Sequence, residues 1–263
     1  MNCIITTAIN PTISAQSLAT EIASKLDSRY VAREGNSLEA IKANYQVDVI
    51  IVITKNGLIA HTPTGEFFFH LSMADLRIKN LINGKHDHMV SAMGLESGMS
   101  VLDCTLGLAS DAIVASYLTG ATGKVVGLEA SPIISLLATH GLKNYQTETE
   151  EIRQALHRIT VINTDYYDYL CSLPENSFDI VYFDPMFRRP IDSSSNIKPL
   201  RFLADTRPLL LNAVREATRV AKKRVVIKET RFSKVFDELN IKNRMGGKYS
   251  SIEYGVIYAG SEK

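Results

Sequence analysis

Cysteine is scarce in this chain, which has three among its 263 residues and no CxxC pair. Cys3, Cys104 and Cys171 are scattered, which argues against a disulfide framework or a zinc site and suits a reducing cytoplasm. Long apolar runs are also missing: the stretch 47–54 has the length of a strand, far below the ~20 residues needed to cross a bilayer. The amino terminus shows no basic segment followed by a long apolar one, so we expect a cytoplasmic protein without a signal peptide or membrane contact.

A surplus of charge of either sign is absent as well. The 29 lysine and arginine residues and the 28 aspartate and glutamate residues leave a formal net charge of +1. Bulk electrostatics therefore do not demand a nucleic-acid partner, and any surface for one has to be local. The hydrophobic share of 45% permits a sizeable core, and the length fits one large domain or one domain with a small companion.

Residues 1–75 are predicted to form a small α/β domain. We expect a strand, two helices and a three-stranded meander, with elements at 3–7, 14–26, 37–45 and 47–53 and turns at Asn56-Gly57 and Thr64-Gly65. Ser37 has the side chain of an N-cap for the second helix. The sequence leaves the role of this unit open between RNA binding, pairing of subunits in a homodimer and capping of the second domain.

From residue 73 onward, segments with strand and helix patterns alternate. This rhythm predicts βαβ units and a mainly parallel sheet, and residues 76–263 are the second predicted domain. Helices are expected at 73–83 and 86–94, and a last strand at 248–259 is expected to pair with residues near 241–245. Between them we expect strands at 100–103, 124–129, 159–162, 178–183 and 223–228, and helices at 109–119, 131–144, 165–172, 206–222 and 231–239.

One predicted strand breaks into a loop that is typical of nucleotide binding. Asp103 ends the strand, Gly107 follows four residues later, and the next helix begins near Asp111. Such a turn lets backbone N–H groups approach a polar ligand, and glycine removes the Cβ that would block it. Dinucleotide-binding loops usually have three glycines, so this loop taken alone fits an ordinary βα turn equally well. Its predicted ligand contacts are Asp103, Thr105, Gly107, Leu108 and Asp111.

The next two strands also end at acidic residues. Glu129 lies 26 positions after Asp103, where a carboxylate can accept two hydrogen bonds from a ribose diol; a solvated glutamate is the alternative. Asp165 can accept from an adenine amine, or it can cap the helix that follows, and the two roles can coexist. Ala130 and Tyr166, which follow these two acids, complete the predicted cofactor contacts.

The segment Asp184-Pro185-Met186-Phe187 ends another apolar strand abruptly. It would offer hydrogen-bond acceptors and an aromatic ring at the carboxyl edge of the sheet, where open α/β proteins bind ligands. An exocyclic base amine is a weak nucleophile because its lone pair is delocalised into the ring. The Asp184 carboxylate and the Pro185 carbonyl can bind its hydrogens and localise that pair, while Phe187 stacks on the base.

Orientation would then dominate the rate, since well-positioned reactants gain ~7–11 kcal/mol and no metal or covalent intermediate is needed. The competing interpretation is that Pro185 only ends the strand and Phe187 packs in the core.

Together, the loop and the strand tip indicate methyl transfer from S-adenosylmethionine. The segments 103–112 and 184–187 resemble those of the RsmJ-type family of class I amino-methyltransferases, whose members methylate the exocyclic amine of a guanine in small-subunit ribosomal RNA. The resemblance covers roughly residues 73–263. It implies a Rossmann-like methyltransferase fold, with a mostly parallel seven-stranded sheet and helices on both faces, and S-adenosyl-L-methionine as cofactor. It further implies a catalytic role for Asp184, and RNA of the small ribosomal subunit as partner.

The chain departs from the family pattern in three places. Ala109 stands where the pattern usually has a second glycine, and Met186 replaces the second proline of the Asp/Asn-Pro-Pro-aromatic motif. The amino-terminal unit does not look like that of the characterised RNA enzymes, which puts the shared RNA target in doubt.

Basic residues follow the strand tip directly. Arg188 and Arg189 can clamp phosphates beside the site, with Met186 as a further substrate contact; a solvated loop with surface arginines is the alternative. Lys228 ends its strand near the same edge, as a substrate contact or as part of a structural ion pair.

The run His86-Asp87-His88 has no matching ligand cluster elsewhere, so we expect no metal site. A contact from residues 79–89 to the cofactor or substrate is expected instead.

Other functions compete with this one. The methyl acceptor can be a small molecule or a protein, which the near-neutral charge slightly favours. A non-catalytic module that binds RNA or a partner is a different class. A nicotinamide dehydrogenase fits least, because the loop has few glycines and no acid/base site for hydride transfer is evident.

Overall fold

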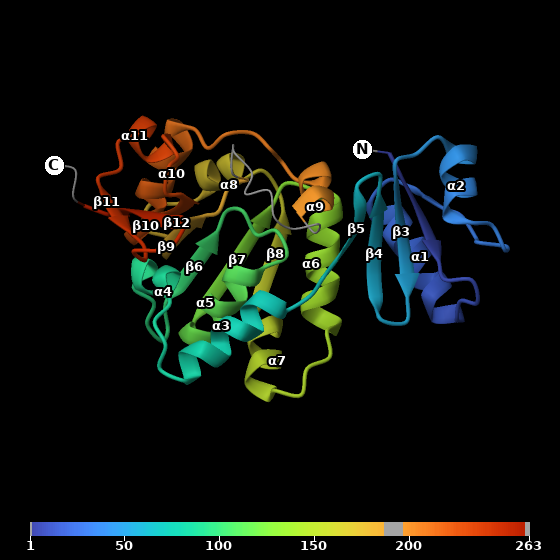
Figure 1. Cartoon of the computed structure of the whole chain (residues 1–263), viewed down its shortest axis with the longest axis horizontal. Coiled ribbons are helices and arrows are strands. Elements are labelled where there is room, and N and C mark those ends of the chain that lie inside the picture. The colour runs from blue at the N-terminus through green and yellow to red at the C-terminus, as the bar shows by residue number, and fades with distance from the viewer. Residues whose placement is uncertain (1, 187–196, 261–263) are drawn as a thin grey trace.

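The computed structural model describes residues 2–186 and 197–260. Two sheets lie side by side, a five-stranded one formed by the first 70 residues and a seven-stranded one formed by the rest (Figure 1). The chain enters the larger sheet through helix α3 (Ser72–Ile82), so the domain boundary predicted between residues 75 and 76 falls inside a helix. The division into two domains itself stays a prediction.

The smaller sheet has the order β2-β1-β3-β4-β5. Its elements are β1 (Cys3–Thr7), α1 (Ile13–Lys25), β2 (Arg29–Tyr30), α2 (Leu38–Tyr45), β3 (Val49–Thr54), β4 (Gly57–Thr62) and β5 (Gly65–Phe68). Strand β1 runs parallel to β2 and β3, and β3, β4 and β5 form the expected antiparallel meander. Ser37 caps α2, since its side chain accepts a hydrogen bond from the Ala40 N–H. The two-residue β2 was not predicted, because so short a strand has no periodic pattern.

The larger sheet has the order β11-β12-β10-β9-β6-β7-β8. Its strands are β6 (Ser100–Asp103), β7 (Lys124–Glu129), β8 (Ile159–Asn163), β9 (Phe178–Phe183), β10 (Ala221–Thr230), β11 (Asn243–Met245) and β12 (Ile252–Tyr258). The first five run parallel to one another, and β12 is antiparallel to both β10 and β11. This arrangement confirms the predicted Rossmann-like sheet.

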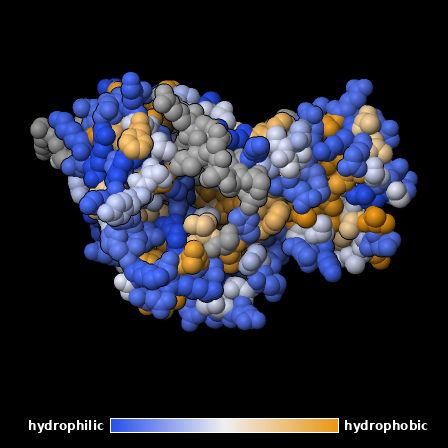
Figure 2. All heavy atoms as spheres, viewed as in Figure 1, coloured by the Kyte–Doolittle hydropathy of each residue, from blue (hydrophilic) through white to orange (hydrophobic). Residues whose placement is uncertain are grey.

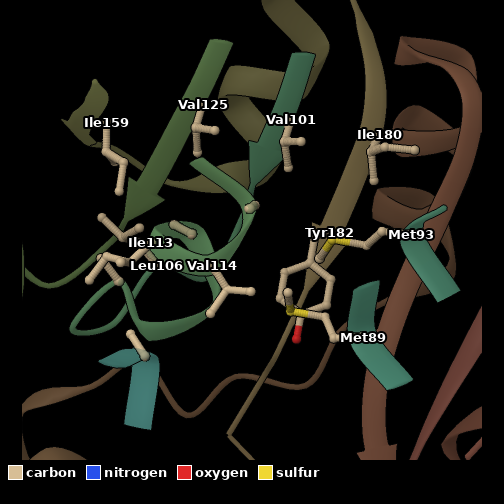
Figure 3. Close-up of a cluster of buried hydrophobic side chains, with 14 of the residues drawn as sticks. Met89, Met93, Val101, Leu106, Ile113, Val114, Val125, Ile159, Ile180 and Tyr182 are labelled. Carbon is tan, nitrogen blue, oxygen red and sulfur yellow. The ribbon is translucent and has the colours of Figure 1, made fainter. Parts of the chain in front are cut away.

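Helices cover both faces of this sheet. They are α3, α4 (His88–Met93), α5 (Ser110–Thr119), α6 (Pro132–Asn144), α7 (Glu150–His157), α8 (Tyr166–Ser172), α9 (Ile197–Leu203), α10 (Leu211–Val220) and α11 (Val235–Glu238). Val101 packs on one face with α4 and α5, as Figure 3 shows, while the next residue, Leu102, belongs to the cluster on the other face with α8 and α10. A strand buried on both faces is the expected consequence of helical crossovers.

Four helices differ from the prediction, and one of them, α9, was not predicted. Helix α7 was missed, although its buried Ile152, Ala155 and Leu156 have helical spacing. Helix α10 is shorter than predicted and begins at Leu211. Pro208 disfavours helical geometry at the residue before it, which explains why the helix does not begin at 206. Helix α11 has four residues instead of the predicted nine, 231–239. Among the described residues, no helix is long and apolar enough to span a bilayer.

The smaller sheet shares a hydrophobic core with helices α6 and α9 of the larger unit. Ile5 and Ile51 of the smaller sheet lie in the same cluster as Ile134 of α6 and Leu203 of α9. Phe69, in the connection to α3, lies so close to α6 that a Cβ on Gly141 would be 2.0 Å from its ring. The smaller sheet is therefore packed firmly against the larger unit.

The strand order places a crevice at the centre of the larger sheet. From β6 the chain proceeds through β7 to β8 on one side and then crosses to β9 on the other side of β6. Ligands of open α/β sheets bind at such a switch point, outside the carboxyl ends of the strands. Asp103 is the last residue of β6 and Asp184 follows β9, and these two strands flank the switch point.

Candidate active site

A cavity of about 740 Å³ opens at the carboxyl edge of the larger sheet. The residues around it come from the loop after β6, the ends of β7, β9 and β10, the start of β12, helix α9, and β5 with the connection to α3. Figure 2 shows apolar side chains gathered in the hollow between the parts of the molecule that carry the two sheets. Both the predicted cofactor loop and the predicted catalytic tip therefore face one space.

The loop after β6 has the conformation that a nucleotide-type turn requires. Asp103 is buried, and its carboxylate accepts a hydrogen bond from the Thr105 N–H at 3.0 Å. Burial raises the pKa of Asp103 well above its ordinary value. Ala109 has φ 64° and ψ 18°, in the left-handed region that favours glycine. Alanine, which stands where the family pattern usually has a second glycine, thus adopts a backbone conformation that favours glycine.

Glu129 ties the cofactor loop to the end of β7. Its carboxylate accepts from the Gly107 N–H at 3.0 Å and from the Ser131 N–H at 2.8 Å, one bond to each oxygen. The side chain is buried, and burial raises the pKa of Glu129. Because each carboxylate oxygen has more than one acceptor site, both can still receive hydrogen bonds from a diol.

Asp165 caps helix α8, one of the two roles predicted for it. Its Oδ1 accepts from the backbone N–H groups of Tyr167 and Asp168, and its Oδ2 forms an ion pair with Arg207 at 2.5 Å. Burial raises the pKa of Asp165, but the hydrogen bond from Arg207 lowers it. The resulting pKa lies below its ordinary value. Its contact with an adenine amine stays a prediction. Tyr166 lines the cavity beside it, with its ring edge-on to Phe183 at 5.6 Å.

The segment that follows β9, Asp184-Pro185-Met186, contacts the cofactor loop directly. The Asp184 N–H donates to Oγ1 of Thr105 at 2.6 Å, across 79 positions of sequence. Asp184, Pro185 and Met186 all line the cavity. The structure therefore brings together the two strand tips that the sequence predicted to meet. The predicted contacts Phe187, Arg188 and Arg189 lie outside the described residues.

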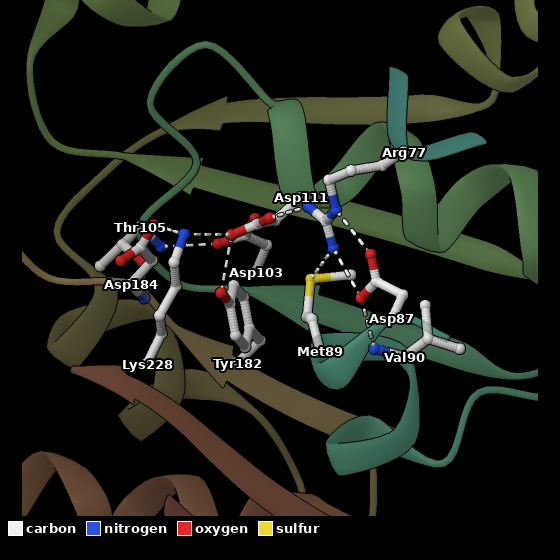
Figure 4. Close-up of polar contacts among 10 residues, drawn as sticks. All are labelled: Arg77, Asp87, Met89, Val90, Asp103, Thr105, Asp111, Tyr182, Asp184 and Lys228. Atoms are coloured by element: carbon white, nitrogen blue, oxygen red, sulfur yellow. Dashed lines mark hydrogen bonds and ion pairs between the residues drawn. The ribbon is translucent and has the colours of Figure 1, made fainter. Parts of the chain in front are cut away.

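A line of alternating charges extends from Asp184 to helix α3 (Figure 4). Lys228 Nζ lies 2.7 Å from Oδ2 of Asp184 and 3.2 Å from Oδ2 of Asp111. Asp111 also forms an ion pair with Arg77, whose Nε lies 2.8 Å from Asp87. Every member of this line is largely buried. Each carboxylate between two cations is thereby held in its charged form.

The pKa values of the line reflect burial and neighbours together. Burial alone would raise the pKa of Asp111, but Lys228 and Arg77 bring it below its ordinary value. Burial would lower the pKa of Lys228, but Asp111 and Asp184 bring it above the usual range. The pKa of Asp184 is raised by burial and by Asp111, against the opposing effect of Lys228.

Sequence reasoning found part of this network. It predicted Asp111 as a cofactor contact and left Lys228 open between a substrate contact and a structural ion pair; the structure shows the ion pairs. Arg77 was missed, since nothing in its spacing relates it to the loop. Tyr182, whose hydroxyl donates to Asp111 Oδ2 at 2.7 Å, was also missed, although strand alternation predicts that it faces away from Phe183.

The segment 86–88 contributes to the network through its aspartate. Asp87 caps α4 and binds Arg77, while His86 Nε2 lies 2.8 Å from the Ser91 hydroxyl. Within the described ranges, no group of three or more histidine, cysteine or acidic residues is placed to hold a metal ion.

The cavity residues fit S-adenosylmethionine. A Cβ at Gly107 would have no neighbour within 4 Å, so the loop backbone is open to a ligand there. Glu129 supplies paired acceptors, and the aromatic Tyr166 lies on the same wall. Of the predicted cofactor contacts, those that line the cavity are Asp103, Thr105, Gly107, Leu108, Asp111, Glu129, Ala130 and Tyr166.

Comparisons with known proteins agree with this class. The crystal structure of a SAM-dependent methyltransferase from Neisseria gonorrhoeae superposes with a TM-score of 0.68 over 99% of this chain and 97% of its own, at 15% sequence identity, which supports the fold. A family model described as "Putative SAM-dependent methyltransferase" matches residues 60–253. The chain belongs to this family of SAM-dependent methyltransferases, and S-adenosyl-L-methionine is its cofactor.

Two curated relatives show how far the similarity extends. The uncharacterized protein YpiP of Bacillus subtilis is 39% identical over 254 residues, which cover 96% of this chain and 98% of that protein. Ribosomal RNA small subunit methyltransferase J of Buchnera aphidicola is 30% identical over 178 residues, which cover 63% of this chain and 67% of that protein. The resemblance to the RsmJ-type family is thereby confirmed for the methyltransferase part of the chain.

Proposed function

We propose that this methyltransferase acts on an exocyclic base amine of RNA, and that its acceptor is a guanine in small-subunit ribosomal RNA. One observation carries the proposal: the hydrogen bond between the Asp184 N–H and Thr105 Oγ1 holds the Asp-Pro-Met tip against the cofactor loop. The similarity to relatives named ribosomal RNA small subunit methyltransferase J supports the choice of acceptor.

The chemistry assigned to the tip is hydrogen-bond acceptance. S-adenosylmethionine supplies an already activated methyl group, so the chain has to orient and activate the amine. The Asp184 carboxylate and the Pro185 carbonyl accept the two amine hydrogens and localise the nitrogen lone pair. Lys228 favours the ionised form of Asp184, whose two oxygens both accept hydrogen bonds, whereas a protonated carboxyl would present a donor to the amine. Orientation of the amine against the methyl group then accounts for most of the rate gain.

The remaining predicted contacts complete the substrate side of the proposal. Met186 lines the cavity beside the tip and would touch the base edge. Phe187 is proposed to stack on the target base, and Arg188 and Arg189 to hold phosphates without reading sequence. A base has to leave its stack to enter such a cavity, which costs a few kcal/mol that these contacts would offset.

The test is transfer of labelled methyl to small ribosomal subunits isolated from a strain that lacks the gene, followed by mapping of the modified nucleotide. The proposal expects label on the exocyclic amine of one guanine. Label that appears in a cell extract and survives ribonuclease treatment would assign a small molecule or protein acceptor instead.

A matched pair of variants tests the role of Asp184. Asp184→Ala should lower turnover at least about a hundredfold, the scale of removing one preorganised hydrogen-bonding group. Calorimetry should show little change in cofactor affinity for this variant. Asp48→Ala, at an exposed position before β3, is the control and should retain full activity. Retained turnover in Asp184→Ala would remove the catalytic assignment.

A further inference from the structure

Strand β5 and the connection after it contain three consecutive phenylalanines, Phe67, Phe68 and Phe69, which differ in how far they are buried. Phe67 is 5% exposed and belongs to the core that the smaller sheet shares with α6 and α9. Phe69 packs on α6, against Gly141, and its ring is edge-on to Tyr145 at 5.7 Å. Both rings therefore anchor the smaller sheet to the larger unit.

Phe68, between these two anchors, has a different environment. Its side chain is 43% exposed, and it lines the cavity that holds the candidate active site. Successive side chains of a strand point to opposite faces, so burial of Phe67 on one face directs Phe68 to the other. The backbone of β5 is held by its ladder to β4, where Phe68 lies opposite Ile59.

His70 and Met73 line the cavity together with Phe68. The ring of His70 lies edge-on to it, with centroids 5.9 Å apart and planes at 70°. Met73, at the start of α3, is 56% exposed and lines the same cavity. A large, exposed ring in the wall of a pocket, beside another exposed apolar side chain, is a feature of ligand-binding surfaces. The shared core does not need this ring, because Phe67 and Phe69 already provide the anchors.

We propose that Phe68 is a stacking surface for an RNA base that adjoins the base entering the cavity. This inference rests on the proposed function and extends it: the five-stranded unit would supply part of the RNA-binding site. An aromatic face accepts any base, because every base has a π-face, and stacking is the usual way in which proteins bind unpaired nucleotides. Of the three roles that the sequence left open for residues 1–75, RNA binding is the one this ring supports.

Substitution of Phe68 separates stacking from catalysis. Phe68→Ala should raise the KM for undermethylated small ribosomal subunits about 5- to 100-fold, the range that one base–aromatic stack supplies. A role limited to stacking on RNA predicts that kcat and the Kd for S-adenosylmethionine change less than about twofold. Phe68→Trp should retain the wild-type KM, since it preserves a flat face.

Two further measurements make the test specific. Fluorescence anisotropy measures RNA binding without methyl transfer. With a labelled single-stranded oligoadenylate of about 12 nucleotides, Phe68→Ala should show a rise in Kd that matches the rise in KM. Phe232→Ala, which removes a ring that is 90% exposed elsewhere in the chain, is the matched control and should leave both readouts unchanged.

The outcomes distinguish this inference from the proposed function. If the wild type methylates ribosomal RNA and Phe68→Ala has an unchanged KM, the stacking role is wrong while the function stands. An equal loss of oligonucleotide affinity in Phe232→Ala would also overturn it, because the effect would then be general to exposed rings. If the wild type methylates a protein or a small molecule but no RNA, the proposed function fails and the inference with it.

Discussion

The ammonium group of Lys228 lies 2.7 Å from the carboxylate of Asp184. This pair joins the residue after β9 to the neighbouring strand β10, which continues past Lys228 to Thr230, two residues beyond the predicted strand end. Ile227 of β10 is in register with Phe183 of β9, so the residues that follow them lie opposite each other at the carboxyl edge of the sheet. The same ammonium lies 3.2 Å from Asp111 at the start of α5. The proposed amine-binding carboxylate is thus oriented by a cation that is itself held in place.

The Lys228–Asp184 pair predicts a pH dependence of turnover. Burial, Asp111 and Glu229 raise the pKa of Asp184, and Lys228 lowers it. The carboxylate is the active form, so activity falls as the pH falls through that pKa. Removing the cation in Lys228→Met raises the pKa further and should move the acid limb of kcat/KM to higher pH. Near neutral pH we expect a loss of about 10- to 100-fold, the scale of one charged hydrogen bond.

The control for this prediction is Lys228→Arg, which keeps the charge and should return the acid limb toward the wild-type position. The pH dependence of kcat/KM for the three proteins is the measurement. An acid limb that coincides in Lys228→Met and the wild type would show that Lys228 does not set the ionisation of Asp184.

Arg77 is expected to stabilise the fold through two buried carboxylates. Its side chain is 17% exposed and pairs with Asp87 and Asp111, which are 13% and 10% exposed. Arg77→Met would leave both acids without this partner, and we expect the free energy of unfolding to fall by about 3 kcal/mol. Urea denaturation is the measurement. Lys79→Met, on the same helix, removes an exposed pair with Asp75 and should change the free energy by less than about 1 kcal/mol; similar losses in the two variants would refute the prediction.

Glu129 is expected to determine cofactor affinity. Glu129→Ala removes the acceptors of the Gly107 and Ser131 N–H groups and the proposed acceptors of the ribose diol. The Kd for S-adenosylmethionine should rise at least about tenfold, because one hydrogen bond to a charged group contributes ~1.5–3 kcal/mol. Calorimetry measures the change, with Glu175→Ala at an exposed position as control. An unaltered Kd in Glu129→Ala would rule out the ribose assignment.

Strand β7 contacts the cofactor loop so closely that adding one methyl group to Gly127 should disturb the packing. A Cβ at Gly127 would lie 2.3 Å from Cδ1 of Leu106, a residue that is 4% exposed. Gly127→Ala should therefore lower the free energy of unfolding by about 1–3 kcal/mol and weaken cofactor binding by displacing the loop.

Leu106→Ala provides the test of this cause, since it removes the atoms that collide. Alone it should destabilise by about 2–5 kcal/mol, the usual cost of truncating a buried leucine. In the double variant, the loss in free energy of unfolding should be smaller than the sum of the two single-variant losses by at least about 1 kcal/mol. A double-mutant cycle with urea denaturation is the measurement. Strict additivity would mean that the Leu106 contact is not the reason for glycine at position 127.

Much of the fold follows from local pattern. Strands β6, β7 and β9 have the predicted bounds, because runs of buried, β-branched residues ending at an acid mark both the length and the end of a strand. The turn at Asn56-Gly57 and the Ser37 cap were also predicted from a few neighbouring residues. The structure confirms the β3–β4 hairpin and the cap of α2. Short elements such as β2 escaped prediction, because two residues contain no period to detect.

The sequence by itself determined which strand ends carry acids, and therefore that Asp103, Glu129 and Asp184 would gather at one edge of a parallel sheet. Only the tertiary structure decided their partners. Arg77 and Lys228 lie 34 and 117 positions from Asp111, and Phe68 reaches the cavity only because its neighbours are fixed on α6. Such contacts depend on strand order and on the direction of each side chain, which packing between distant segments sets and a local period does not record.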